Sequence, residues 1–172
     1  MVASTSLGQN YITKNGSIKF FSDTPMEKIE AYNQQVNAAL DIGSGNLAFN
    51  VLMKSFKFEK AMMQNHYNSD KFLDTKGFPK AKLKGKITNL ADVDFTKDGK
   101  YSVVVEGELT IKGKTNSISE KGTIDINGSS VNVQSKFNIT LADYGINFVE
   151  GKPSTNIAKE VEVTVHSEYS PE

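Results

Sequence analysis

The feature that most limits how this chain can fold is a repeated two-residue alternation of apolar and polar side chains. Residues 80–87 read Lys-Ala-Lys-Leu-Lys-Gly-Lys-Ile, so the lysines share one face of an extended chain and the small or apolar residues share the other. A helix would mix the two sets, because its side chains repeat about every 3.6 residues. The alternation recurs in residues 47–53, 101–111, 131–141 and 161–169. It predicts β-strands that each have one buried face and one face in water.

Short turn sequences separate these segments. Residues 43–45 read Gly-Ser-Gly, 97–100 Lys-Asp-Gly-Lys, 112–114 Lys-Gly-Lys and 127–129 Asn-Gly-Ser. Such residues favour tight turns, which join antiparallel neighbours. Closing a meander of long antiparallel strands removes the unpaired edges that would otherwise aggregate. We therefore expect an all-β fold that closes into an antiparallel barrel.

Two segments depart from this clear alternation. Residues 26–41 carry some apolar side chains near helical spacing, but the apolar side chains of 36–42 also alternate, and the Asn and Gln residues within 33–37 disfavour a helix interior, so the segment is predicted to be a strand. Residues 59–67 lack alternation and are rich in helix formers. They predict one short helix, closed off by 68–70.

Composition excludes several classes of function. The 20 Lys and Arg residues balance 20 Asp and Glu residues, so the clustered positive excess that nucleic-acid binding requires is absent. There is no cysteine, and His66 and His166 are the two histidines, which excludes disulfides, thiol nucleophiles, zinc–thiolate sites and multi-histidine metal sites. No run of about 18 apolar residues predicts a membrane span. A length of 172 residues corresponds to one domain.

The first nine residues form a separate segment. They are small and weakly apolar, and Ser6-Leu7-Gly8 has the two small residues, one apart, that a leader cleavage region requires. The charged and long apolar regions that precede such a site are missing from the sequence. Residues 1–9 are interpreted either as a leader remnant, which would place the protein in the periplasm or outside the cell, or as a disordered or cloning-derived tail. Residues 10–172 are the single barrel domain.

Five short sequences occur in an order that resembles one protein family. They are residues 16–22, residues 45–51, His66 followed by Lys71-Phe72-Leu73 and Phe78-Pro79, residues 109–115, and residues 143–146. Their order is similar to that of the YceI-like polyisoprenoid-binding proteins, although Lys112 stands where the family has a histidine. The resemblance implies an eight-stranded lipocalin-like barrel with one short helix capping one end. It also implies a periplasmic or secreted location and an isoprenoid or other long-chain lipid as partner.

The inward strand faces supply the candidate ligand-binding residues. An eight-stranded barrel is either filled by side chains or holds one slender ligand. The small residues Ala81, Gly85, Gly107 and Ser135 on these faces favour a cavity, although a strand glycine can equally mark a bend. We expect the lumen to be lined by Phe49, Met53, Val103, Val105, Phe137, Ile139 and Val163. We expect an adaptable lid, or alternatively a simple plug, made of Met62, Met63, Tyr67, Phe72 and Phe78.

The polar residues form no recognisable enzyme signature. The sequence shows no Ser-His-Asp arrangement, phosphate-binding glycine loop or metal set, and no cofactor is expected. His66, Lys112 and Lys114 are candidates for contact with a polar head group. We expect non-catalytic binding or transport of a polyisoprenoid or isoprenoid quinone. The alternatives are a filled barrel acting as a structural or stress-related interaction module, and a barrel enzyme that uses His66. Homodimerisation is left open.

Overall fold

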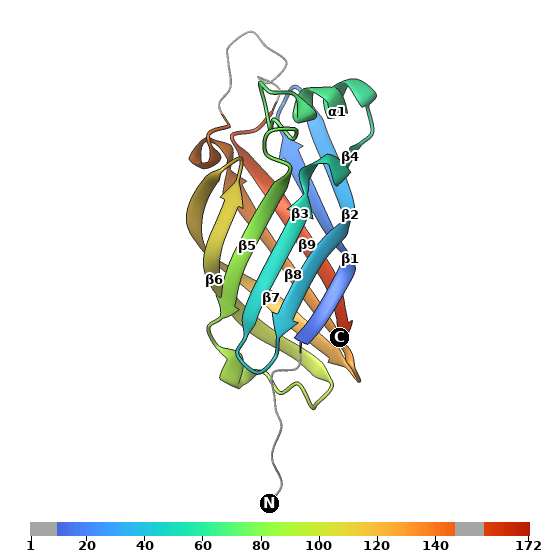
Figure 1. Ribbon diagram of the computed structural model, residues 1–172, viewed down its shortest axis with the longest axis vertical. Coiled ribbons are helices and arrows are strands. Elements are labelled where there is room, and N and C mark those ends of the chain that lie inside the picture. Colours follow the sequence, from blue (N-terminus) through green and yellow to red (C-terminus); the bar gives the residue numbers. More distant parts are fainter. Residues whose placement is uncertain (1–9, 147–156) are drawn as a thin grey trace, which may run out of the picture.

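Eight antiparallel strands close into a barrel in the computed structural model, which describes residues 10–146 and 157–172 (Figure 1). The order around the wall is β1-β9-β8-β7-β6-β5-β3-β2, and pairing of β1 with β2 closes it. The two-residue strand β4 (Lys57–Phe58) pairs with β2. The barrel strands are β1 (Asn10–Asp23), β2 (Lys28–Asp41), β3 (Asn46–Leu52), β5 (Lys80–Ile87), β6 (Gly99–Ile111), β7 (Lys114–Asn127), β8 (Ser130–Thr140) and β9 (Glu160–Pro171).

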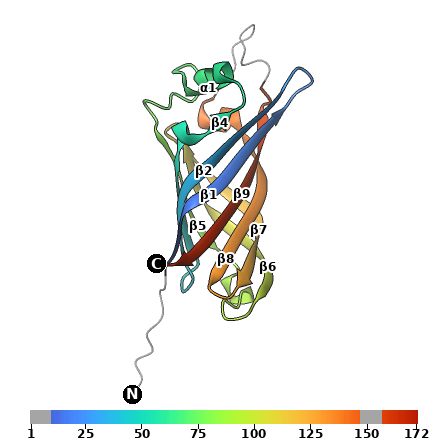
Figure 2. The same cartoon turned by 90° about the vertical axis from the view of Figure 1, so that its right-hand side faces the viewer.

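The helical elements are short and lie at the barrel ends. Helix α1 (Ala61–Asn68) covers one end, and the C-terminus of the chain lies near the other (Figure 2). The described residues also form three single-turn 3₁₀ helices: η1 (Met53–Ser55), η2 (Leu90–Asp92) and η3 (Leu141–Tyr144). None of the helices in the described ranges has the length and apolar character needed to span a bilayer. The expected all-β, eight-stranded antiparallel barrel with one capping α-helix is therefore confirmed.

The alternation located most strands but did not reveal β7. Its inward positions include Glu120 and Gly122 between Ile118 and Ile124, which interrupts the apolar stripe. Both ends of β7 were nevertheless predicted as turns. At the turn before it, Lys112 has φ 51° and Gly113 has φ 75°. Two successive positive φ values are typical of the type I′ turn of a two-residue hairpin, because the twist of this turn matches the right-handed twist of the two strands that it joins.

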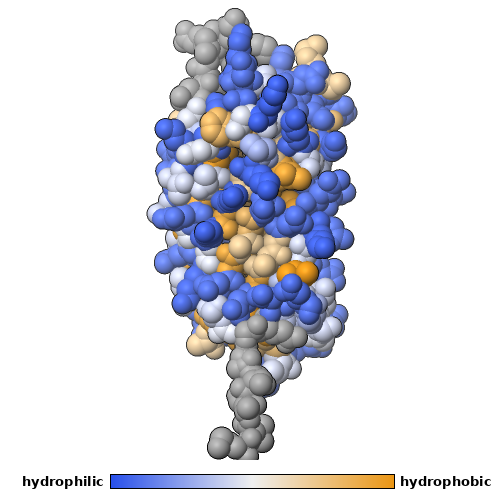
Figure 3. Space-filling view, viewed as in Figure 1, coloured by the Kyte–Doolittle hydropathy of each residue, from blue (hydrophilic) through white to orange (hydrophobic). Residues whose placement is uncertain are grey.

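Hydrophilic side chains cover most of the outer wall over β2, β3 and β5, with apolar surface showing between them (Figure 3). These hydrophilic side chains are the polar residues of the alternating strands, which point outward. The apolar half faces inward and fills the end of the barrel distant from α1. Six fully buried side chains pack there: Leu40, Ile87, Ile124, Ile126, Val131 and Tyr169. Tyr169 accepts a hydrogen bond from the Ser167 hydroxyl at 3.2 Å, so its buried phenol oxygen is satisfied.

Two isoleucines on the inward face of β7 allow the filled half of the barrel to be compared with the other half. Ile124 is fully buried among packed side chains, whereas Ile118 is only partly buried. We expect Ile124→Ala to cost about 3 kcal/mol of unfolding free energy, because it creates a cavity in a packed core. We expect Ile118→Ala to cost about 1 kcal/mol, because it removes less buried surface. Urea unfolding of both variants measures the difference, and equal losses would contradict a half-filled barrel.

The glycines Gly85 and Gly107 do not leave space in the lumen, contrary to the sequence-based expectation. They lie directly opposite each other on β5 and β6. A Cβ atom added to Gly107 would overlap the Lys84 carbonyl oxygen and would lie 2.5 Å from the Gly85 Cα. The missing side chains therefore let two backbones approach closely. Neither glycine lines the cavity described next, whereas Ala81 and Ser135 do.

Candidate ligand-binding cavity

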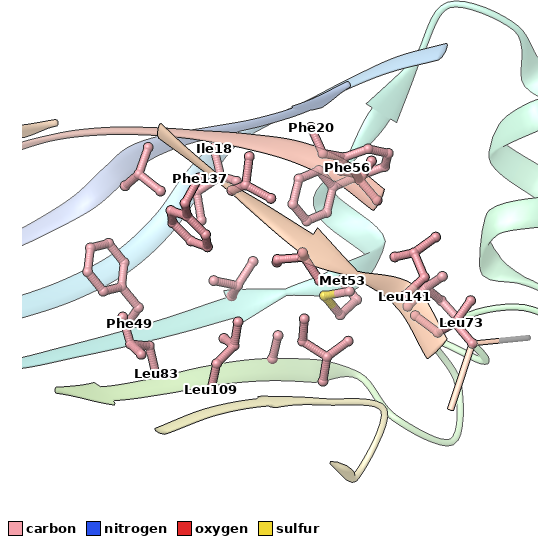
Figure 4. A pocket seen from close by; sticks show the side chains of 18 of the residues that line it. Ile18, Phe20, Phe49, Met53, Phe56, Leu73, Leu83, Leu109, Phe137 and Leu141 are labelled. Atoms are coloured by element: carbon pink, nitrogen blue, oxygen red, sulfur yellow. The ribbon is translucent and has the colours of Figure 1, made fainter. Parts of the chain in front are cut away.

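The half of the barrel next to α1 is hollow. Its cavity has a volume of about 890 Å³ and is lined by residues from all eight barrel strands. Volumes of about 300–1,000 Å³ are typical of small-molecule and cofactor sites. Apolar side chains dominate the lining and point into the space from several strands (Figure 4). The labelled members include Ile18, Phe49, Leu83, Leu109, Phe137 and Leu141.

The cavity is elongated, because its lining extends along most of the length of a barrel strand. On β6 the lining runs from Val103 through Val105 and Leu109 to Ile111. At about 3.3 Å per residue and a strand tilt of about 40°, these positions span about 20 Å along the barrel axis. A long, narrow, apolar space of this kind suits a chain-like ligand, which gains free energy from buried area more than from directional bonds.

An aromatic cluster closes part of the mouth beneath α1. The ring of Phe20 lies 5.1 Å from that of Phe56, 5.6 Å from that of Phe58 and 5.9 Å from that of Tyr67, measured between centroids. The Tyr67 hydroxyl donates a hydrogen bond to the Met53 carbonyl at 3.0 Å. Burial raises the pKa of Tyr67, so the hydroxyl keeps its proton and this bond persists through the physiological pH range. Helix α1 is thereby fixed over this side of the mouth.

Polar residues reach the cavity at several places, which include ionisable groups at the rim and in the wall of β7. His66, Ser69, Asp70 and Lys71 lie at the rim, where α1 ends and the next turn begins. Glu120 faces inward from the wall strand β7, and partial burial raises the pKa of its carboxyl. Within the described ranges, no group of His, Asp and Glu side chains is arranged to hold a metal ion. The cavity therefore offers apolar surface with few directional contacts.

Sequence comparison places this architecture in a family. Residues 11–169 match the family model described as the YceI-like domain. The chain belongs to the YceI-like family. This confirms the resemblance on which the fold expectation partly rested. None of the curated proteins matches the chain in sequence.

Solved structures share the fold of this YceI-like protein. A polyisoprenoid binding domain from Saccharophagus degradans, implicated in plant cell wall breakdown, has a TM-score of 0.80 at 14% identity, covering 96% of this chain and 100% of that one. Burkholderia cenocepacia BcnA has a TM-score of 0.75 at 19% identity, covering 90% and 96%. The Campylobacter jejuni YCEI protein has a TM-score of 0.66 at 16% identity, covering 87% and 88%. At these identities the likeness concerns the fold.

The structure brings most of the predicted site residues of the YceI-like barrel together. All of them line the cavity except Met62 and Phe78. Met62 is 70% exposed. Helix α1 turns Met63 and Tyr67 inward, and Met62, one residue before Met63, points about 100° away from it around the helix axis. Phe78 packs outside the cavity, where a Cβ atom added to Gly113 would lie 3.0 Å from its ring. Binding by the lining residues stays a prediction.

Of the three residues expected to contact a polar head group, one lies at the cavity and two do not. His66 lies at the rim of the cavity, whereas Lys112 and Lys114, at the β6–β7 turn, are not among the residues that line it. Sequence reasoning missed Phe20, Phe56 and Phe58, which come from β1, from the residue after η1 and from β4. Phe20 alternates with Lys19 and Ile18, and Phe56 and Phe58 alternate with Lys57, so their inward direction could have been predicted, although the contact between their rings could not. Leu47 and Val51 likewise occupy inward positions on the same alternating strand as Phe49 and could have been predicted.

Proposed function

We propose that this YceI-like protein binds a long-chain amphipathic lipid, a polyisoprenoid or an isoprenoid quinone, and carries it without transforming it. The observation that carries the proposal is the elongated apolar cavity of about 890 Å³. The name of the Saccharophagus degradans structure, a polyisoprenoid binding domain, supports the choice of lipid class. A barrel filled along its whole length, the structural-module alternative, does not fit the hollow that the described residues enclose.

A carrier role follows from the energetics of an apolar ligand. Each buried CH₂ group gains about 0.8 kcal/mol relative to water. In a cell the competing environment is a membrane, which offers the chain nearly the same transfer free energy. The net preference for the barrel is therefore small, and a bound lipid can be released again. Rim groups such as His66 and Lys71 are available to the polar end of the ligand.

Native mass spectrometry with and without organic extraction tests the proposal. Protein purified from a bacterial host, or incubated with a quinone or polyprenyl phosphate, is expected to carry one lipid. Ala81→Phe places a large ring in the cavity and is expected to lower the bound fraction about tenfold or more, through lost apolar burial. Ala48→Phe is the matched control, because Ala48 is exposed on the outer face of the adjacent strand β3.

Two outcomes of this experiment would contradict the proposal. The first is a wild-type protein that carries no lipid after purification and binds no added quinone or polyprenyl lipid. In that case the cavity does not serve to bind such a lipid. Equal occupancy of the two phenylalanine variants means that lipid binds somewhere other than the cavity. Far-ultraviolet circular dichroism of both variants provides the check that each retains the barrel.

We also propose a periplasmic or secreted location. Its support is the small-residue pattern of Ser6-Leu7-Gly8, which lies outside the described residues, and the resemblance on which the expectation was based. Fractionation of the native host tests this location. Recovery of the protein in the cytoplasmic fraction alone would contradict it.

A further inference from the structure

The hydrogen-bonded wall of the barrel is interrupted on one side. β7 pairs with β6 from Ile126 to Lys114, the first residue of β7. β8 pairs with β9 from Val131 to Thr140. β7 and β8 pair with each other only as far as Gly122 and Ser135. Beyond that pair, the two strands continue towards α1 with no ladder between them in the part of the chain that the structure describes.

Two hydrogen bonds mark the ends of this interruption. At the end farther from α1, the lower end, the Ser135 hydroxyl donates to the Lys121 carbonyl at 2.7 Å. At the upper end, the Asn116 side-chain amide donates to the Asp143 carbonyl of η3 at 2.8 Å. We call the interval between them, residues 117–121 of β7 and 136–140 of β8, the β7–β8 window.

The sequence of these strands opposes closure of the window. Continuing the antiparallel register by one step beyond Gly122 and Ser135 would set Lys121 directly against Lys136. Like charges in directly opposite positions destabilise a strand pair. The next step would set the Glu120 carboxyl against the Phe137 ring inside the barrel, where a carboxylate without a partner is costly.

The burial of the inward side chains changes at the same point. On β7, Ile124 and Ile126 are buried where the strands pair, whereas Ile118 is only partly buried. On β8, the same change separates the buried Val133 from the partly buried Phe137. Ile118 and Phe137 both line the cavity, so the cavity reaches the wall at the window. Among the described residues, the backbone groups facing the interval have no ladder partners, and such groups need side chains or water as hydrogen-bond partners.

A groove on the outer wall adjoins the lower end of the window. It is lined by outward residues of β7, β8 and β9, including Lys121, Lys136 and His166. Gly122 and Ser135 line both this groove and the cavity. Val103, Gln134 and Val165 also line both spaces, so the groove lies against the same stretch of wall as the cavity.

The mouth beneath α1 is the alternative route, and part of it is firmly packed. Tyr67 is buried, is bonded to the Met53 carbonyl and lies against the rings of Phe20, Phe56 and Phe58. Passage on this side of the mouth requires separation of packed aromatic side chains, whereas no backbone ladder joins the described strands at the window. The geometry points to the window as the easier path.

We propose that long-chain lipid enters and leaves the cavity sideways, through the β7–β8 window. This inference rests on the proposed function for its ligand, but the route itself can be tested with any apolar probe. It predicts that tying β7 to β8 across the window slows exchange while leaving the cavity and its equilibrium occupancy unchanged.

The absence of cysteine from the chain makes a specific cross-link possible. Ser119→Cys with Asn138→Cys places two thiols on the exposed outer face of the window, where a bifunctional thiol reagent can bridge them. Asp125→Cys with Asn132→Cys is the matched control, because these outward-facing residues are directly paired below the window and line neither the cavity nor the groove. Entry of an uncharged naphthylamine dye is followed by fluorescence, and exchange of a polyprenyl phosphate with phosphatidylcholine vesicles is followed by native mass spectrometry.

We expect the window cross-link to slow dye entry and lipid exchange about tenfold or more, with equal final occupancy, and the control cross-link to leave both rates unchanged. Unchanged rates with the window bridged, or equal slowing by both bridges, would overturn the proposed route. If the dye enters but the polyprenyl phosphate binds no form of the protein, the proposed function fails while the dye rates still decide the route.

A second variant keeps the test open if the double-cysteine protein does not fold or cross-link. Lys121→Glu removes the like charge that closure would bring opposite Lys136, whose ammonium lies 3.5 Å from the Glu162 carboxylate, and puts an opposite charge in its place, which favours closure. We expect dye entry to slow by about threefold, in line with the strength of such pairs. Entry that is unchanged or faster in this variant would count against the route.

Discussion

Gly107→Ala is expected to destabilise the barrel by about 3 kcal/mol, since overpacking against an immobile backbone is among the costlier single substitutions. The added methyl group would overlap the Lys84 carbonyl oxygen, and the Gly85 Cα stands 2.5 Å from the new atom. Both obstacles are backbone atoms of the adjacent strand β5, so no side-chain rotation relieves the overlap. Equilibrium unfolding in urea measures the loss.

Gly128→Asn is the control for this substitution. Gly128 has φ 62° in the turn between β7 and β8, and a Cβ atom there would meet nothing within 4 Å. Asn tolerates the left-handed conformation, so the cost should stay below about 1 kcal/mol. If Gly107→Ala were as mild as Gly128→Asn, the close approach of β5 and β6 would not exist in solution.

Val105→Arg is expected to abolish lipid uptake while leaving the barrel folded. Val105 lines the cavity, where a guanidinium without a partner would be costly. Its directly opposite neighbour on β7 is Glu120, whose carboxylate can pair with the new charge. The result is a folded barrel with a charged side chain in its lumen. Native mass spectrometry with an added quinone measures uptake, and thermal unfolding measures stability.

Two further variants make the outcome of Val105→Arg interpretable. Ser102→Arg puts the same side chain on the exposed outer face of β6 and should leave uptake intact. Adding Glu120→Gln to Val105→Arg removes the carboxylate partner, which should cost about 1 kcal/mol more than Val105→Arg alone, because water screens a partly exposed ion pair. Normal lipid uptake by folded Val105→Arg protein would show that this side chain does not occupy the binding space.

The two halves of the barrel differ in packing. Ile124 and Tyr169 belong to a close-packed half that stabilises the closed sheet. Phe49 and Leu109 belong to the hollow half, where inward apolar side chains leave space for a ligand. Substitutions in the first half should therefore affect stability and those in the second half should affect binding. The same alternating pattern produces both halves.

Several features could be predicted from the sequence because they depend on local geometry. A period of two identified the strands that became β3, β5, β6, β8 and β9 and assigned their inward faces. Turn residues marked the strand ends, as the positive φ of Gly113 shows. The same reasoning placed Val103 and Val163 towards the interior, where both line the cavity.

Only the tertiary structure decided which inward residues surround space and which fill it. From the sequence, Gly85 and Gly107 are expected to leave space in the lumen, but in the structure backbone or side-chain atoms of the neighbouring strand lie where their side chains would be. Phe20 and Tyr67 lie far apart in the chain, yet they stack at the mouth. The physical reason is that alternation specifies the direction of a side chain, whereas packing density depends on which distant strands meet it once the barrel closes.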